Sequence, residues 1–227
     1  MRILAIGDIH GCSRAFVVLL DAVQPQRDDL IITLGDYVDR GPDPAGVIER
    51  LLRLKKTHRL VSLRGNHELM LLAKRGDKAG AGRPLLSGGQ GLGAYSIPTG
   101  DGNLVEVPVP DSHWDFLEGD CVNYFETDRY FVVHANADPD VALADQPDYM
   151  LFWVPFYKPA PHRSGKVMVC GHTGQLSGVP ANLGHAVCID TRAYGGGWLT
   201  CLDVETGEYW QANQAGQCRK GRLSKAE

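Results

Sequence analysis

The sequence predicts an α/β sandwich built on mixed sheets, and two observations support this fold class. The first third of the chain alternates short apolar runs with segments of helical periodicity, which is typical of a β-α-β-α-β unit. The last third carries further short apolar runs and a hairpin signal at Thr206-Gly207, between residues 199–204 and 208–211. Strands and hairpins that follow a β-α-β unit favour mixed sheets over one fully parallel wound sheet.

The first third contains three short apolar runs that we expect to be buried strands. They are Ile3–Ile6, Leu30–Leu34 and Leu60–Leu63. Between them, Ala15–Val23 and Ala45–Leu54 carry apolar residues at helical spacing, which predicts two helices. We expect Ser13 to cap the first helix and Asp43 to cap the second.

The middle of the chain, residues 76–112, is rich in glycine and proline and has few periodic apolar positions, so we expect loops and short turns there. Its segment Gly88-Gly89-Gln90-Gly91-Leu92-Gly93 follows no clear strand and lacks the Lys-Ser/Thr of a nucleotide-binding loop. Strand-like runs resume at 131–133, 167–170 and 186–189. The basic end, residues 219–225, is expected to be a solvated tail.

The composition is that of a globular protein, and we assign residues 1–227 to a single domain. Hydrophobic residues make up 44% of the chain and charged residues 22%, and the formal net charge is -4. This balance argues against a general nucleic-acid or membrane partner. The opening apolar stretch is interrupted at Gly7-Asp8, too soon for a signal peptide or a membrane span, so we expect a cytoplasmic protein. The oligomeric state stays open.

The six cysteines do not indicate a site of their own. None is followed six positions later by an arginine, the spacing that a thiol phosphatase needs, and no C-x-x-C pair is present. Cysteine-based catalysis, a zinc knuckle and a redox pair are therefore not indicated.

Polar residues gather directly after the first three predicted strands. The three segments are Gly7-Asp8-Ile9-His10-Gly11, Gly35-Asp36-Tyr37-Val38-Asp39-Arg40-Gly41 and Arg64-Gly65-Asn66-His67-Glu68. Neighbouring parallel strands end at the same edge of a sheet, where open α/β folds place their sites, so these segments are expected to converge. Two later apolar runs each end in a histidine, His134 and His172, which repeats the arrangement.

These segments together supply ligands for divalent metal ions. The oxygen and nitrogen donors are Asp8, His10, Asp36, Asn66, His134 and His172. Mixed donors suit borderline ions such as Mn, Fe or Zn. Six side chains are too many for one tetrahedral ion, but they can serve two ions roughly 3.5–4 Å apart if a carboxylate bridges them. Asp36 follows the central strand of the three, and we predict that it is the bridge. Any one of these residues alone is more often a cap or a surface residue than a metal ligand, but five clusters in order favour the metal site.

The ordered motifs resemble those of the phosphoprotein phosphatases in the calcineurin-like metallophosphoesterase superfamily. The family signature GD-x-HG, GD-x-VDRG, GNHE, HAG and GH corresponds here to Gly7–Gly11, Gly35–Gly41, Gly65–Glu68, His134–Asn136 and Gly171–His172. The segments Ile189-Asp190-Thr191 and Leu199-Thr200 are also similar to the closing strands of the family. The resemblance covers almost the whole chain and implies a four-layer α-β-β-α sandwich of two mixed sheets.

The resemblance also implies a role for each matching residue. Asp8 and His10 would bind the first ion, Asp36 would bridge the two ions, and Asn66, His134 and His172 would complete the second site. His67 would protonate the leaving oxygen, and Asp39 would hold its imidazole. Arg40 and Arg64 would bind the phosphate, in keeping with the fit between a guanidinium fork and phosphate oxygens.

The sequence departs from the family pattern at two positions. Asn136 replaces the glycine of HAG, which is expected only to adjust the turn. Pro155 stands where Leu-x-Trp-x-Arg would place a third phosphate-binding arginine. Lys158 and Arg163 are nearby candidates for that role.

The resemblance implies a hydrolase that directs water, activated by two divalent ions, onto the phosphorus of a phosphate monoester. We expect manganese as the metal and a serine/threonine phosphoprotein or phosphopeptide as the substrate, with no nucleic-acid or membrane partner. The alternative is a dinucleoside polyphosphate hydrolase of the same superfamily. Those enzymes usually have a glutamine in place of His10 and lack Asp39, so both residues favour the monoesterase. A catalytically inactive binding module is a third interpretation, which the intact ligand set and His67 oppose.

Overall fold

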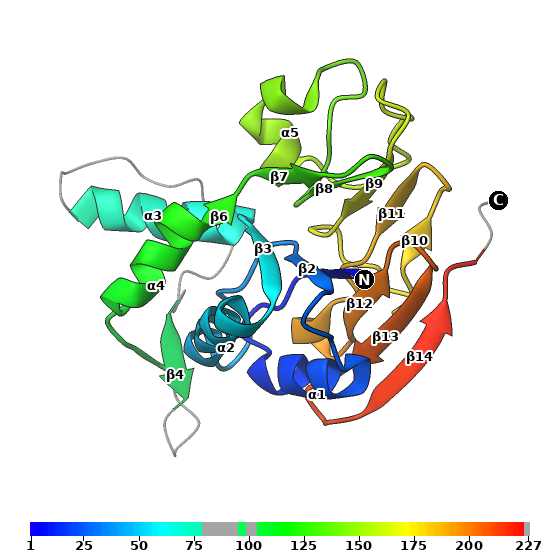
Figure 1. The fold of residues 1–227 in the computed structure, drawn as a ribbon. Helices are drawn as coiled ribbons and strands as arrows, with labels where there is room; N and C mark the ends of the chain where they lie inside the picture. The colour runs from blue at the N-terminus through cyan, green and yellow to red at the C-terminus, as the bar shows by residue number, and fades with distance from the viewer. Residues whose placement is uncertain (79–94, 99–103, 225–227) are drawn as a thin grey trace.

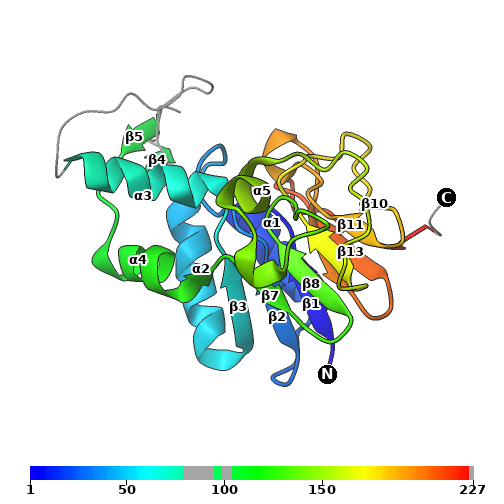
Figure 2. The same ribbon diagram turned by 90° about the horizontal axis from the view of Figure 1, so that it is seen from above.

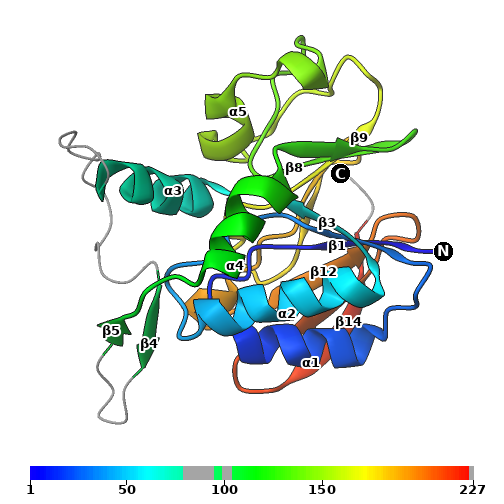
Figure 3. The same ribbon diagram turned by 60° about the vertical axis from the view of Figure 1, so that its left-hand side comes forward.

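The chain folds into four layers, in the order helix, sheet, sheet, helix (Figure 1). The computed structural model describes residues 1–78, 95–98 and 104–224. Within them, α1 (Ser13–Val23) and α2 (Pro44–Thr57) cover the outer face of the larger sheet, and α5 (Asp148–Trp153) lies over the smaller one, as Figure 3 also shows. The predicted α/β sandwich of two mixed sheets is confirmed.

The larger sheet has the strand order β14-β13-β12-β1-β2-β3-β6. Its strands are β1 (Ile3–Ile6), β2 (Leu30–Thr33), β3 (Arg59–Leu63), β6 (Cys121–Val122), β12 (Leu199–Asp203), β13 (Glu208–Ala212) and β14 (Cys218–Arg222). β1, β2, β3 and β6 run parallel. On the other side, β12 is antiparallel to β1, β13 to β12 and β14 to β13.

The smaller sheet has the strand order β10-β11-β9-β8-β7. Its strands are β7 (Tyr124–Glu126), β8 (Tyr130–Val133), β9 (Val167–Cys170), β10 (Ala181–Asn182) and β11 (Ala186–Cys188). β8, β9 and β11 are parallel, and each outer strand is antiparallel to its neighbour. Both sheets are therefore mixed, as predicted.

The strands are apolar on both faces because each face packs into a different core. In β1, Leu4 and Ile6 pack with α1 and α2, while Ala5 faces the layer between the sheets. In β8, Val132 contributes to that same middle layer, while Phe131 packs outward with the residues of α5. Side chains alternate along a strand, so continuous apolar runs are what a strand buried on both faces requires.

The shorter elements complete the described structure. They are α3 (Asn66–Lys78), α4 (Asp111–Asp115), the π-helical turn η1 (Phe116–Asp120), the 3-10 turns η2 (Leu143–Asp145) and η3 (Ala193–Gly195), and the hairpin of β4 (Ser96–Pro98) and β5 (Leu104–Glu106). Seen from above, in Figure 2, α3 and this hairpin project to one side of the layered body. No helix within the described ranges has the length and apolar character needed to cross a membrane.

Three local predictions are wrong. Ser13 does not cap α1: the N-cap is Cys12 without a side-chain hydrogen bond, and Ser13 Oγ instead donates to Asp43 Oδ2 at 2.6 Å. Residues 76–112 are not all loop, because they include the end of α3, the β4–β5 hairpin and the start of α4. Residues 218–222 form β14 against β13 rather than a solvated tail. The cap assigned to Asp43 is confirmed, since its carboxylate accepts from Gly46 N at 2.8 Å. The segment 88–93 lies outside the described residues.

Candidate metal centre

Strand register brings the polar segments to one edge of the larger sheet. Ile6, the last residue of β1, pairs with Thr33 of β2, and Thr33 pairs with Ser62 of β3. The three parallel strands therefore end together, and Asp8, Asp36 and Asn66 follow within a few residues. His134 and His172 follow β8 and β9 of the other sheet. The predicted convergence of the three clusters is observed.

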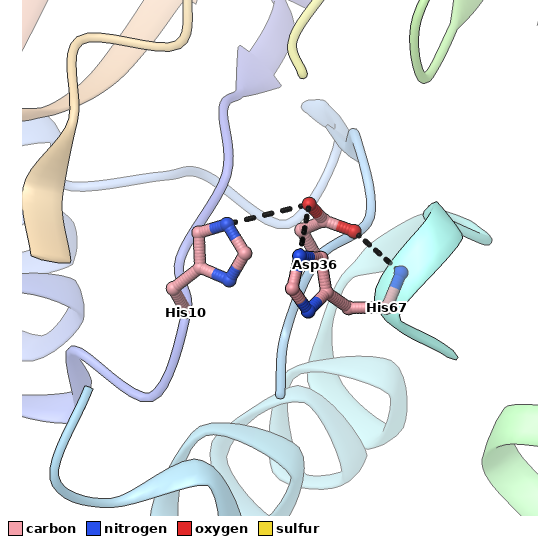
Figure 4. Close-up of side chains that lie close together, drawn as sticks. All are labelled: His10, Asp36 and His67. Carbon is pink, nitrogen blue, oxygen red and sulfur yellow. Dashed lines mark hydrogen bonds and ion pairs between the residues drawn. The ribbon is translucent and has the colours of Figure 1, made fainter. Parts of the chain in front are cut away.

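The first group of candidate ligands is His10, Asp36 and His67, whose donor atoms lie within 4.8 Å of one another (Figure 4). His10 Nε2 is 3.3 Å from Asp36 Oδ2, and His67 Nε2 is 3.9 Å from the same oxygen. The backbone N–H of His67 donates to Asp36 Oδ1 at 3.1 Å. The imidazole of His67 therefore lies beside the first candidate ion position, in addition to the ligands predicted from the sequence.

The second group is Asp36, His134 and His172, again within 4.8 Å. His134 Nε2 lies 3.5 Å from Asp36 Oδ1 and 3.0 Å from Asn66 Oδ1, and His172 Nδ1 lies 3.1 Å from Asn66 Oδ1. Asp36 belongs to both groups and presents a different oxygen to each. This is the geometry that a bridging carboxylate between two ions requires.

Burial leaves His10, His134 and His172 neutral, which is the form that binds metal. Desolvation lowers the pKa of His10 to about 4, and it does the same for His172, where His134 also contributes. Burial also lowers the pKa of His134. His10 Nδ1 contacts Val38 O at 3.0 Å and His134 Nδ1 contacts Leu34 O at 2.7 Å, which leaves Nε2 of both rings directed at the cluster.

Asp8, predicted as a ligand of the first ion, is buried beside His172 and belongs to neither of the two groups. Both of its carboxylate oxygens accept from the backbone N–H of His172, at 3.1 and 2.9 Å, and this contact ties β1 of one sheet to the segment after β9 of the other. Burial, together with the charges of Asp190 and Asp36, raises the pKa of Asp8. Such crowded carboxylates are stabilised by cations. The donor set of this edge thus fits a pair of divalent ions.

His67 forms a hydrogen-bonded chain with Asp39 and Arg40. Its Nδ1 lies 2.6 Å from Asp39 Oδ2, and its Nε2 lies 3.2 Å from Arg40 Nη2. Burial lowers the pKa of the imidazole, but the hydrogen bond to Asp39 and the charge of Asp36 outweigh it, so the pKa of His67 is raised overall. A guanidinium has donors only, so Nε2 accepts from Arg40 and Nδ1 donates to Asp39 in this conformation. A ring whose pKa is raised by a carboxylate partner suits a general acid.

The backbone of this edge is strained at the residues that carry the chemistry. Among the residues that the structure describes, positive φ angles occur at His10 (44°), Asp36 (52°), Asp39 (64°), Arg40 (68°) and His172 (62°). Left-handed backbone is costly for residues with a Cβ and persists where the surroundings hold it. The turns therefore direct these side chains toward the candidate metal centre, and the left-handed backbone raises the local conformational energy.

Glu68 is a residue of this edge to which the sequence analysis assigned no role. Its buried carboxylate accepts from the backbone N–H groups of Asp36, Gly65, Tyr37 and Val38, at 2.7, 2.8, 2.8 and 3.3 Å. Burial and the charge of Asp36 raise its pKa to about 7, against the effect of these N–H groups. Glu68 thus fixes the loop that carries the bridging candidate. Its position in the GNHE motif was the available signal.

Two arginines considered for phosphate binding have other partners in this structure. The Arg64 guanidinium donates to the carbonyls of Leu117, Glu118 and Cys121 and to Asn123 Oδ1, at 3.0–3.2 Å. Arg163 donates to the Asp140 carbonyl at 3.0 Å. Arg40 alone, among the arginines named from the sequence, contacts a residue of the cluster.

Pro155 lies close to the centre, as the motif spacing predicts. Its carbonyl accepts from Asn136 Nδ2 at 3.2 Å, and the next residue, Phe156, donates its N–H to Thr173 Oγ1 at 2.8 Å, directly after His172. The position of the expected third arginine is therefore beside the site, and the proline leaves it without a guanidinium.

Comparison with known proteins places this arrangement in a family. The family model described as calcineurin-like phosphoesterase matches residues 1–182. The chain belongs to that family. Members of this family hold two metal ions, and the His/Asp clusters described above fit such a pair. The expected superfamily and its hydrolase chemistry are thus confirmed, whereas the identity of the metal is not determined.

The curated relatives share a specific name. A protein of Paracidovorax citrulli named symmetrical bis(5'-nucleosyl)-tetraphosphatase is 43% identical over 145 residues, which cover 61% of this chain and 45% of that protein. A protein of the same name from Acidovorax sp. is 47% identical over 75 residues, 32% of this chain and 26% of that protein. The matched regions therefore span less than half of these relatives' length.

Solved structures resemble the chain in fold. The cold-active protein-tyrosine phosphatase of a psychrophilic Shewanella has a TM-score of 0.66 at 14% identity, over 96% of this chain and 80% of that one. At this identity the likeness shows the fold alone.

The expectation of a phosphoprotein or phosphopeptide substrate is wrong. The curated relatives are tetraphosphatases, which act on dinucleotides. They support the alternative hypothesis, a dinucleoside polyphosphate hydrolase, better than the monoesterase hypothesis. His10 and Asp39, which favoured the monoesterase, did not separate the two classes.

Proposed function

We propose that residues 1–227 form a single domain that hydrolyses dinucleoside tetraphosphates with the help of two divalent metal ions. Manganese is the metal that we propose. The observation that carries the proposal is the 43% identity over 145 residues with a symmetrical bis(5'-nucleosyl)-tetraphosphatase. The site supports it because its ligands suit ions that bind phosphate oxygens, and because Arg40 stands next to them.

Each residue of the edge has a part in this proposal. Asp8, His10, Asp36, Asn66, His134 and His172 would hold the ions. When bound, the ions would neutralise phosphate charge and lower the pKa of a water molecule toward neutrality. Arg40 binds an oxygen of the phosphate under attack, where its guanidinium can donate two hydrogen bonds. Arg64 would bind a second phosphate oxygen only after its hydrogen bonds to the carbonyls of residues 117, 118 and 121 are broken.

His67 would place a proton on the departing group. Its Nδ1 is fixed by Asp39 at 2.6 Å, so Nε2 is directed toward Asp36 and Arg40. A nucleoside diphosphate is a much better leaving group than a serine alkoxide, so its departure depends less on this proton. We therefore expect the contribution of His67 to be smallest for the tetraphosphate and largest for alkyl esters.

The test is a turnover assay with added Mn on diadenosine tetraphosphate, a phosphoserine peptide and nitrophenyl phosphate, with separation of the nucleotide products. We expect two molecules of ADP from each dinucleotide, at a kcat/KM well above that for the peptide. The Asp36→Asn variant, which should lose all turnover, is the negative control. Turnover of the peptide in preference to the dinucleotide, or nucleotide products other than ADP, would contradict the proposal. Absence of turnover on all three substrates by the Mn-loaded protein would favour the inactive binding module.

A further inference from the structure

Arg192 is held in a strained conformation at the rim of the metal centre. It directly precedes the turn η3 and has a φ of 60°. Its backbone N–H donates to Asp190 Oδ1 at 2.8 Å, and its carbonyl accepts from Gly195 N and Gly197 N, at 2.9 and 3.0 Å. Three hydrogen bonds thus maintain a backbone that an arginine does not favour, which is typical of a residue whose side chain must point in one direction.

Two glycines make room for the Arg192 side chain. A Cβ atom on Gly174 would lie 2.4 Å from Arg192 Cγ, and a Cβ atom on Gly195 would lie 3.2 Å from Arg192 Nη2. Gly174 is two residues after the candidate ligand His172, so the aliphatic stem crosses the loop that carries that ligand. Within residues 1–78, 95–98 and 104–224, the guanidinium donates no hydrogen bond and forms no ion pair within 4.0 Å.

Tyr194 links Arg192 to the residues that handle phosphate. The Arg40 guanidinium lies 4.5 Å from the centre of the Tyr194 ring, and the Arg192 guanidinium lies 5.9 Å from it. The ring of His10 meets the same ring edge-on, with centroids 4.8 Å apart. The half-buried tyrosine therefore places two arginines beside one candidate metal ligand.

A simpler role for Arg192 would be to neutralise the buried carboxylate of Asp190. The contact between them runs through the backbone N–H, and the two side chains do not form an ion pair within 4.0 Å. The guanidinium lies beside a phosphate site and donates to no acceptor among the described residues, so it has the geometry of an anion-binding group instead.

We propose that Arg192 binds the phosphate next to the one under attack, so that it selects polyphosphate chains over single phosphate esters. The inference rests on the proposed function and identifies a residue that determines which class of substrate the enzyme accepts. Arg40 holds the reacting phosphate and Arg192 its neighbour, with Tyr194 positioning both side chains. Arg192 would also give the site a second guanidinium, in place of the arginine that Pro155 replaces.

The experiment compares Arg192→Gln and Arg192→Lys with a charge control, Arg129→Gln. Arg129 is exposed and pairs with Glu205 at 2.7 Å, so its loss removes the same charge from an ordinary surface. Two quantities are measured on the Mn-loaded proteins. One is kcat/KM for diadenosine tetraphosphate and for nitrophenyl phosphate. The other is the dissociation constant of ADP and of orthophosphate, from calorimetry.

We expect Arg192→Gln to lower the ratio of the two kcat/KM values about tenfold and to weaken ADP binding about tenfold more than orthophosphate binding, the order expected for a lost charge-assisted contact. Arg192→Lys should recover only part of this, because an ammonium lacks the planar fork. The control should match the wild type. Equal losses on both substrates and both ligands would overturn the proposal and favour neutralisation of Asp190.

The two proposals can fail separately. If the wild-type protein does not cleave the dinucleotide but Arg192→Gln selectively weakens ADP binding, the proposed function is wrong and the role of Arg192 stands. If the dinucleotide is cleaved and the variants show no selective loss of ADP binding, the role of Arg192 is wrong and the function stands.

Discussion

Replacing Glu68 by glutamine should damage both stability and metal binding. The carboxylate accepts four backbone N–H groups, two on each oxygen. Glutamine keeps one acceptor oxygen and turns an NH₂ group toward the other two N–H groups, which then lack an acceptor in a buried place. Each buried donor without a partner costs about 1–3 kcal/mol, so we expect a loss of about 2–6 kcal/mol in the free energy of unfolding.

The same change should loosen the Asp36 loop, because Asp36 N and Gly65 N share the oxygen Oε2. Metal content after gel filtration should fall with stability, although Glu68 is not one of the proposed ligands. Denaturant unfolding and metal analysis, both on purified variants, measure the two effects. Glu118→Gln is the control: this exposed glutamate pairs with Arg75, and its loss should change stability by no more than about 0.5 kcal/mol. Wild-type stability and metal content in the Glu68 variant would refute the reasoning.

Three further predictions concern the bridge, the proton donor and an ion pair remote from the site. Asp36→Asn should lose both ions and all turnover together, because Asp36 is shared by the two ligand groups; metal analysis that finds two tightly held ions would remove it from the bridge. His67→Asn should keep both ions and lose about 10²–10⁴-fold on an alkyl phosphate but distinctly less on nitrophenyl phosphate, since nitrophenolate departs without a proton; equal losses would assign His67 to phosphate or metal binding. Asp29→Asn should destabilise the fold by about 2 kcal/mol at pH 7: burial raises the pKa of Asp29, but hydrogen bonds from Arg2 and Gln26 outweigh it and lower the pKa to about 2. Because this folded-state pKa is depressed, the difference between wild type and variant should vanish as the pH falls from about 4 to about 2, and a pH-independent difference in urea unfolding would contradict it.

The site could be located from the sequence because strand ends and ligand types carry the information locally. Each of the first three apolar runs ends one or two residues before a polar cluster, and parallel pairing brings such ends together. The predicted ligand positions required no knowledge of side-chain contacts. The contacts themselves were not predictable: the partners of Arg64 are carbonyl groups of residues 117, 118 and 121, which reach it only through the turn η1 before β6.

Elements outside the motifs were predicted less well, for identifiable reasons. Helix α3 begins at Asn66, inside a motif that was read for its chemistry rather than for its periodicity. Strand β14 was missed because Arg219 and Lys220 suggest a solvated tail. In the structure, their long side chains pack over Trp198 and Trp210, at 4.2 and 4.7 Å, so the charged strand covers aromatic rings of the sheet edge.

The choice of substrate class failed because it rested on His10, a candidate metal ligand, and on Asp39, which holds the imidazole of His67. A residue that binds the ion or orients the proton donor acts at the reacting phosphorus, which is the same in an ester and in an anhydride. Groups that contact the rest of the substrate must therefore distinguish phosphate esters from polyphosphates, and we expect these groups on segments without a motif. Arg192 follows Asp190-Thr191 in a stretch that the sequence analysis compared only with closing strands. Its left-handed backbone and its contact with Tyr194 are set by hydrogen bonds from Gly195 and Gly197, which no local pattern reveals. Specificity in this chain is therefore expected to depend on the turn after β11 more than on the motifs, and the Arg192 variants test that expectation directly.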